Sequence, residues 1–139
     1  MTELSWAAIV RFVHERANNC CEYCYTCRKI IGQTMHVDHI LPDGGDSLEN
    51  LCLACPTCNM AKSNVVGDFD PDAESFVYFF NPRTQKWSEH FRWVDGGRQI
   101  EGITPIGRLT VERFSMNLDR LIIARTLWIK AEYHPPSTT

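Results

Sequence analysis

The sequence predicts an α+β fold in which the whole chain, residues 1–139, forms a single domain. Three observations predict it. Apolar residues recur at helical spacing near both ends of the chain, segments rich in β-branched and aromatic residues occupy the second half, and all seven cysteines lie between Cys20 and Cys58. The composition is that of a globular protein, since 44% of the residues are hydrophobic and 22% are charged. A chain of 139 residues has the size of one domain.

An N-terminal helix is predicted over residues 5–17. Ser5 is suited to the N-cap, because its hydroxyl can accept a hydrogen bond from the first helical turn. The apolar positions at helical spacing are Trp6, Ile9, Val10 and Val13. Two asparagines follow and favour the end of the helix.

The next part of the chain predicts a cysteine-bearing turn, two strands and a short helix. The turn covers residues 20–32. Strands are expected over 34–41 and 51–54, and a loop with glycine and acidic residues separates them. A short helix over 56–63 begins with a proline, which is favoured at the first helical position.

The second half predicts an antiparallel β hairpin and a long C-terminal helix. Residues 67–74 are acidic and are expected to form a surface connection, and residues 76–80 have strong β propensity. Residues 90–94 and 98–103 flank an Asp-Gly-Gly sequence, which is typical of a hairpin turn. A helix is expected over 110–133, ended by two prolines.

Two Cys-x-x-Cys pairs predict a metal site. Cys21 and Cys24 form one pair, and Cys55 and Cys58 form the other. Two thiolates three residues apart on a tight turn can bind one tetrahedral Zn²⁺ from the same side, and two such knuckles complete four sulfur ligands. A site closed by four cysteines is structural, so we expect one structural zinc per chain.

The register of the pairs is not unique, because Cys27 and Cys52 also complete Cys-x-x-Cys sequences. Cys52 lies in an apolar run and is interpreted as a buried small hydrophobic residue. Cys20 and Cys27 are interpreted as spare thiols. The alternative is that all seven cysteines are buried or redox-active thiols without a metal.

The two halves of the chain differ in charge. The net charge is −3, but residues 1–80 carry 5 basic and 11 acidic side chains, whereas residues 81–139 carry 9 basic and 6 acidic ones. Binding to a polyanion would therefore use the C-terminal half or a bound metal. No apolar run of about 18 residues and no signal peptide are found, so we expect a cytoplasmic protein with reduced thiols and no membrane partner.

A group of polar residues between and beside the knuckles indicates chemistry. Asp38 and His39 are adjacent on an expected strand, and Asn50 and Asn59 follow. Adjacent side chains on a strand point to opposite faces, unless the strand ends there. An isolated Asp-His pair is more often a surface feature than a site, but its place between two knuckles favours a site.

These residues occur in an order that resembles the HNH endonuclease family, a group of ββα-metal or His-Me finger nucleases. The resemblance covers about residues 10–65, with Asn59 at the third position of the motif. The matching positions are Cys21, Cys24, Val37, Asp38, His39, Ile40, Gly44, Gly45, Asn50, Leu51, Cys55, Cys58, Asn59 and Lys62. The remainder of the chain also looks like that of small bacterial HNH proteins.

The resemblance implies a more detailed fold class. Residues 10–65 would form a zinc-stabilised ββα-metal finger core, flanked by the N-terminal helix. Residues 75–139 would form an extension with a small antiparallel β hairpin or sheet and a long C-terminal helix.

The resemblance also implies roles for the polar residues. His39 would act as general base, because neutral imidazole accepts protons near pH 7. Asp38 and Asn59 would hold one catalytic Mg²⁺ or Mn²⁺ through oxygen atoms. Asn50 would fix the loop and the orientation of His39, and Lys62 would face a phosphate.

The predicted function is metal-dependent endonuclease cleavage of DNA. Arg108 is assigned to the nucleic-acid surface, as one of several arginines in the basic half. One alternative is an inactive zinc-knuckle module that binds nucleic acid or protein, and another is a redox or zinc-storage protein. Because the net charge is modest, a homodimer or a larger complex is expected to help deliver the substrate.

Overall fold

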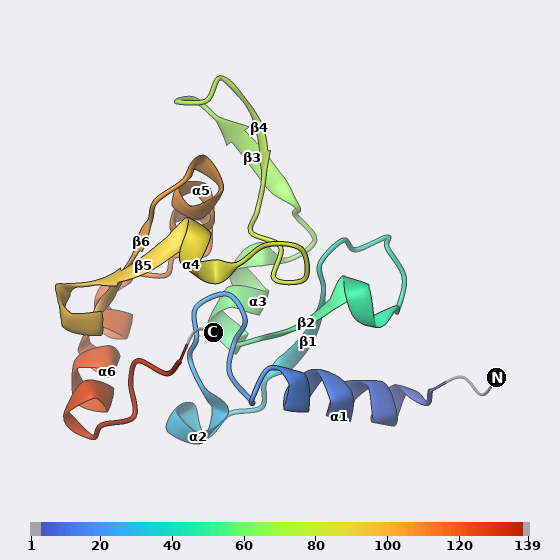
Figure 1. Ribbon diagram of the computed structural model, residues 1–139, viewed down its shortest axis with the longest axis horizontal. Coiled ribbons are helices and arrows are strands. Elements are labelled where there is room, and N and C mark those ends of the chain that lie inside the picture. The colour runs from blue at the N-terminus through green and yellow to red at the C-terminus, as the bar shows by residue number, and fades with distance from the viewer. Residues whose placement is uncertain (1–3, 138–139) are drawn as a thin grey trace.

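The structure is a computed structural model that describes residues 4–137 (Figure 1). It is an α+β fold in which the strands of the described residues form three separate two-stranded antiparallel sheets. The predicted fold class is confirmed. The ends of the predicted domain, residues 1–3 and 138–139, lie outside the described residues.

Helix α1 (Trp6–Arg16) begins where the sequence predicted. The side-chain oxygen of Ser5 accepts a hydrogen bond from the backbone N–H of Ala8 at 3.1 Å. The helix ends just before Asn18 and Asn19, whose φ angles of 53° and 56° lie in the left-handed region that asparagine tolerates. The chain therefore turns sharply into the first cysteine pair.

Strand β1 (His36–His39) pairs antiparallel with β2 (Leu51–Ala54), and α3 (Pro56–Lys62) follows directly. Between the two strands lies the short 3-10 helix η1 (Leu48–Asn50), and before them lies α2 (Arg28–Ile31). All four residues of β2 are buried. This β-β-α unit has the order that the sequence predicted.

Arg16 links α1 to the β-β-α unit, and Figure 1 shows α1 beside β1 and β2. Its guanidinium donates hydrogen bonds to the backbone carbonyls of Leu48 at 3.0 Å and Leu51 at 2.6 Å. These two carbonyls lie at the start of η1 and the start of β2. The helix is thereby held beside the loop that connects the strands.

A second hairpin, which the sequence did not predict, follows α3. Strands β3 (Gly67–Asp70) and β4 (Ser75–Tyr78) pair antiparallel, whereas residues 67–74 were expected to be a surface connection. Figure 1 shows this hairpin projecting from the body of the protein. Gly67 permits the close pairing, because a Cβ there would lie 2.3 Å from the carbonyl oxygen of Val77. Three of the four β4 residues are exposed, so the segment lacks the alternation of a half-buried strand.

The predicted central hairpin is present. A short helix α4 (Trp87–His90) leads into β5 (Phe91–Val94), which pairs antiparallel with β6 (Gln99–Gly102). The 3-10 turn η2 (Asp95–Gly97) connects the two strands, at the Asp-Gly-Gly sequence that predicted the turn.

The prediction of one long C-terminal helix is wrong, because the chain forms two shorter helices there. Helix α5 (Pro105–Arg113) starts five residues earlier than predicted, and α6 (Asp119–Lys130) follows after a break. At the break, Asn117 donates a hydrogen bond to the carbonyl of Ile100 and accepts one from its N–H, at 2.8 and 2.9 Å. These bonds to β6 require the chain to leave the helical path.

The buried residues form one continuous apolar cluster from Val13 to Met116. Tyr23 of the first knuckle packs edge-on against Phe114, with ring centroids 5.0 Å apart. Trp87 donates its indole N–H to the carbonyl of Tyr23 at 2.9 Å. Side chains from residues 75–139 therefore cover the β-β-α unit, although the division into a core at 10–65 and an extension remains a prediction.

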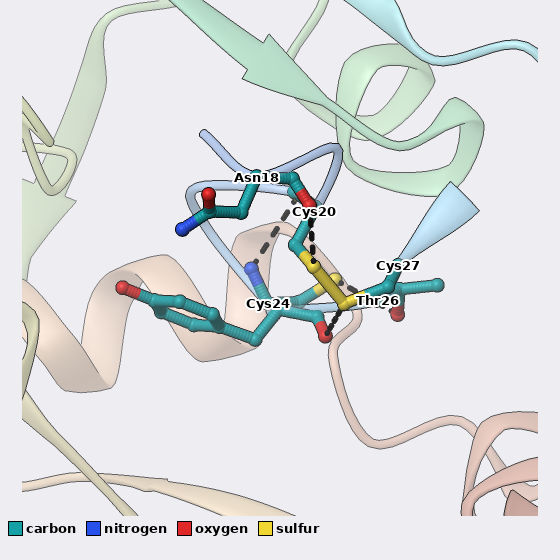
Figure 2. The surroundings of a disulfide bond; sticks show 7 residues. Asn18, Cys20, Cys24, Thr26 and Cys27 are labelled. Carbon is teal, nitrogen blue, oxygen red and sulfur yellow. Dashed lines mark hydrogen bonds between the residues drawn. A yellow bond between two sulfur atoms is a disulfide. The ribbon is translucent and has the colours of Figure 1, made fainter. Parts of the chain in front are cut away.

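A disulfide joins Cys20 and Cys27, so the expectation of fully reduced thiols is wrong for this pair (Figure 2). The two residues face each other as an antiparallel bridge, with Cα atoms 3.9 Å apart. The backbone N–H of Cys21 donates to the carbonyl of Thr26 at 2.8 Å and closes the same turn. Spacing along the chain could not reveal this pairing, because it depends on the turn between the two residues.

No helix among residues 4–137 combines the length and the apolar character that crossing a membrane requires.

Candidate metal centre and active site

The four predicted zinc ligands come together in the structure. The sulfur atoms of Cys21, Cys24, Cys55 and Cys58 all lie within 4.8 Å of one another, and all four residues are buried. The Sγ atoms of Cys24 and Cys55 are 3.6 Å apart. A tetrahedral zinc with bonds of about 2.3 Å needs sulfur atoms about 3.8 Å apart, so the cluster fits Zn²⁺.

Both knuckles have a backbone donor directed at a sulfur. The N–H of Cys24 donates to Cys21 Sγ at 3.5 Å, and the N–H of Cys58 donates to Cys55 Sγ at 3.4 Å. Cys55 is also the N-cap of α3, and Pro56 fixes the first turn of that helix. The second knuckle therefore forms where β2 turns into α3.

The close packing of the four thiols shifts the pKa values of Cys21, Cys24 and Cys58 in different directions. Hydrogen bonds from the other three cysteines lower the pKa of Cys24 well below its ordinary value. Burial raises the pKa of Cys21 well above its ordinary value, and hydrogen bonds to the other cysteines followed by burial raise that of Cys58. Zinc binding to the cluster would thus displace protons from buried thiols.

The register chosen from the sequence is confirmed. Cys52 is fully buried on β2 and lies outside the cluster. Its Sγ lies 3.4 Å from the hydroxyl of Tyr23 and 3.8 Å from Asp38. Cys52 is therefore a buried residue, as predicted, but its neighbours are polar.

Strand β1 and helix α3 form the walls of a cavity of about 580 Å³. Asp38, His39 and Asn59 all line it, and His36 lies at its edge as an exposed neighbour. Because β1 ends at His39, this side chain and that of Asp38 reach the same cavity despite their adjacent positions. The cavity thus brings together three of the predicted catalytic residues.

His39 has two partners that the sequence did not reveal. Its Nε2 atom lies 2.7 Å from Oδ1 of Asp46, in the loop between β1 and η1. Trp6 of α1 lies parallel to the imidazole, with ring centroids 6.4 Å apart and an interplanar angle of 5°. The sequence placed Trp6 in the apolar face of a helix and gave no signal for Asp46.

Asn50 closes the loop that carries Asp46. Its side-chain oxygen accepts a hydrogen bond from the N–H of Leu41 at 3.0 Å, and its amide donates to the carbonyls of Leu41 and Gly45, both at 2.9 Å. Gly44 packs on this amide, where a Cβ would lie 2.7 Å from Nδ2. Asn50 therefore contacts the loop backbone, not His39 itself.

Asp38 lies in a buried ionic network. Its Oδ2 accepts a hydrogen bond from the Tyr23 hydroxyl at 3.0 Å, and its Oδ1 and Oδ2 lie 3.4 and 3.3 Å from the Lys62 ammonium. Burial is the main cause that raises the pKa of Tyr23 well above its ordinary value, so Tyr23 stays a hydrogen-bond donor.

Lys62 and Arg108, the two residues expected to contact nucleic acid, lie in different surroundings. Lys62 was expected to face a phosphate, but its residue is only 2% exposed and its ammonium also donates to the carbonyl of His39 at 3.0 Å. The carboxylate of Asp38 holds it inside. Arg108 is exposed on α5 and lines a different depression beside β5 and β6, so the structure does not bring it to the cavity.

The fold and the site together give a β-β-α unit beside a buried cluster of four cysteines that could hold a metal ion. Residues 21–65 match the family model described as HNH endonuclease, and the match spans both cysteine pairs and the polar cavity residues. The match agrees with the resemblance seen in the sequence, and it suggests a nuclease-type function in general terms. Comparison with curated proteins and with solved structures gave no match.

The first testable prediction concerns the metal centre. Cys58→Ser should lose zinc and its fixed tertiary structure, because metal binding at such a site contributes directly to folding. The measurements are metal analysis and near-UV circular dichroism. A Cys20→Ser/Cys27→Ser double variant is the matched control, and it should keep one zinc while losing about 2 kcal/mol of stability with its disulfide. A folded, zinc-free Cys58→Ser protein would contradict the assignment.

The second prediction separates the two interpretations of Lys62. Lys62→Met should lower the free energy of unfolding by about 3 kcal/mol, because it leaves the Asp38 carboxylate buried without a counter-charge. Urea denaturation measures this, and Lys62→Met/Asp38→Asn should recover part of the loss. If Lys62→Met is instead as stable as wild type and binds DNA more weakly, the lysine contacts phosphate as the family resemblance implied.

Proposed function

We propose that the protein is a metal-dependent endonuclease that hydrolyses phosphodiester bonds of DNA. The observation that carries the proposal is that Asp38, His39 and Asn59 line one cavity inside the HNH segment. A carboxylate, an imidazole and an amide on one cavity wall supply the base and the oxygen donors that this reaction needs.

His39 is the proposed general base. Its side chain is 35% exposed, so a water molecule in the cavity can reach the imidazole. The imidazole accepts a proton from the attacking water, and the resulting hydroxide adds to phosphorus. The carboxylate of Asp46 beside the ring stabilises the imidazolium that forms.

Asp38 and Asn59 are the proposed ligands of a divalent cation, Mg²⁺ or Mn²⁺. Such a cation, when bound, would neutralise charge that develops on the phosphate and the leaving oxygen. The donor set fits a hard cation, because both residues offer oxygen atoms. Each carboxylate oxygen of Asp38 has two lone pairs, so the contacts with Lys62 and Tyr23 leave acceptor capacity on Oδ1.

The positive charge of Lys62 lowers the affinity of this site for a divalent cation. Its ammonium compensates the charge of Asp38, and Asn59 is neutral, so the protein offers little net negative charge to a cation. Water and phosphate oxygens would have to complete the coordination. We therefore expect tight cation binding only together with nucleic acid.

The same ion pair favours the alternative function, a zinc-knuckle module that binds nucleic acid or protein without cleaving it. In that case Asp38 and Lys62 would be a structural pair, and no cation would be needed at the cavity. Supercoiled plasmid incubated with Mg²⁺ or Mn²⁺, with and without EDTA, discriminates between the two functions. Cleavage that EDTA abolishes supports the nuclease, and binding without cleavage under all conditions supports the module.

The third prediction tests the base. His39→Ala should lower the rate of plasmid cleavage by about 10²-fold or more, because it removes the proton acceptor. The zinc content, the melting temperature and the affinity for DNA should stay close to wild type, since His39 is not a zinc ligand. His36→Ala, an exposed histidine at the edge of the same cavity, is the control and should cleave normally. Full activity in pure His39→Ala protein would refute the role.

The fourth prediction tests Asn59. Asn59→Ala should be nearly inactive at about 1 mM Mg²⁺ and partly rescued by more metal, if the amide is a ligand. Asn59→His should shift the preference toward Mn²⁺, Co²⁺ or Ni²⁺, because imidazole favours these ions over Mg²⁺. Cleavage rate against metal concentration measures both effects. A curve for Asn59→Ala that overlays wild type would exclude coordination by Asn59.

A further inference from the structure

The His39 ring is held at its edge and against one face. Asp46 is the hydrogen-bond partner of the ring among the described residues, with 2.7 Å between its Oδ1 and Nε2 of the imidazole. The Trp6 indole lies parallel to the ring, with the two ring centroids 6.4 Å apart. Both contacts come from outside the β-β-α unit's own strands, one from a loop and one from α1.

The loop places Asp46 by backbone contacts, not by the ion pair itself. Gly45, directly before it, has a φ of +81°, and its carbonyl accepts the hydrogen bond from Asn50. Asp46 therefore follows a turn that is fixed from inside the protein, although its side chain is 67% exposed. An exposed ion pair adds little to folding stability, so the contact with His39 matters for the ring rather than for the fold.

We propose that Asp46 is a positioning residue that selects the tautomer of His39. An ionised carboxylate can only accept hydrogen bonds, so Nε2 must carry the proton and Nδ1 must be the basic nitrogen. The catalytic consequence rests on the proposed nuclease function, whereas the tautomer itself does not.

The proton path then has defined atoms. The attacking water transfers one proton to Nδ1 of His39, and its oxygen forms a bond to phosphorus. The bond between phosphorus and the leaving oxygen breaks, and that oxygen keeps the electron pair and takes a proton from solvent. The imidazolium carries protons on both nitrogens. Its Nε2–H donates a hydrogen bond to the negatively charged carboxylate of Asp46, which stabilises the positive charge. After release of the Nδ1 proton to solvent, Asp46 restores the same tautomer.

An amide at position 46 would work against this arrangement. The Asp46→Asn side chain can accept from Nε2–H through its oxygen or donate to Nε2 through its NH₂ group, so it no longer selects one tautomer, and the tautomer protonated at Nδ1, which blocks the base, becomes accessible. Asp46→Ala removes the partner without imposing the opposite tautomer. Asp46→Glu restores a carboxylate. Asp43→Asn is a matched control, because Asp43 is an exposed aspartate in the same loop.

The test measures the ¹⁵N chemical shifts of the His39 imidazole, assigned by comparison with His39→Ala, at about pH 9, where histidine is ordinarily neutral. Wild type, Asp43→Asn and Asp46→Glu should show a protonated Nε2, and Asp46→Asn should gain the tautomer protonated at Nδ1. In plasmid cleavage, kcat should fall by roughly tenfold or more in Asp46→Asn, and by less in Asp46→Ala, with KM nearly unchanged.

Two results would overturn the proposal. One is an Asp46→Asn protein whose imidazole shifts equal those of wild type. The other is an Asp46→Asn protein that cleaves at the wild-type rate while wild type is active. If wild type cleaves no nucleic acid under any condition, the proposed nuclease function fails, and the imidazole shifts still decide whether Asp46 selects the tautomer.

Discussion

The four-cysteine cluster is the constraint on which the rest of the structure depends. One pair of thiols follows α1 and the other pair opens α3, so a cation between them would fix α3 against the first knuckle. Asn59 directly follows the last of these cysteines, and β1 runs beside the same helix. A metal bound at the cluster would therefore help to hold the cavity wall together, although none of the polar residues of that wall belongs to the cluster.

The C-terminal half is linked to the cluster through Arg125. Four thiolates around one Zn²⁺ carry a net charge of −2, which is costly in the protein interior unless a positive charge lies nearby. Arg125 is fully buried, and its hydrogen bonds among the described residues go to the carbonyls of Met116 and Arg98 and to Asn117, not to a carboxylate. Burial lowers its pKa, and the nearby thiols of the cluster counteract this. Arg125 of α6 is therefore a candidate counter-charge for a metal bound at the cluster.

What the sequence predicted correctly is what depends on local spacing. The cap at Ser5, the register of the cysteine pairs and the start of α3 at Pro56 each need only residues within one turn. The errors lie where distant residues decide. The break between α5 and α6 depends on bonds of Asn117 to β6. Spacing along the chain also could not reveal the contact of Lys62 with Asp38, which lies 24 residues away. Asp46 was missed because only the folded loop brings it to His39.

Asp38 and His39 show how one strand can supply two kinds of group. Asp38 lines the cavity but is only 7% exposed, and Tyr23 and Lys62 hold its carboxylate at hydrogen-bond distance, so buried partners fix its position. His39, at the strand end, has a mostly exposed partner and a partly exposed aromatic neighbour. A metal ligand must hold its place before the ion arrives, whereas a base must exchange protons with water. The buried position of Asp38 suits the proposed metal ligand, and the partly exposed position of His39 suits the proposed base. Both positions follow from β1 ending at His39.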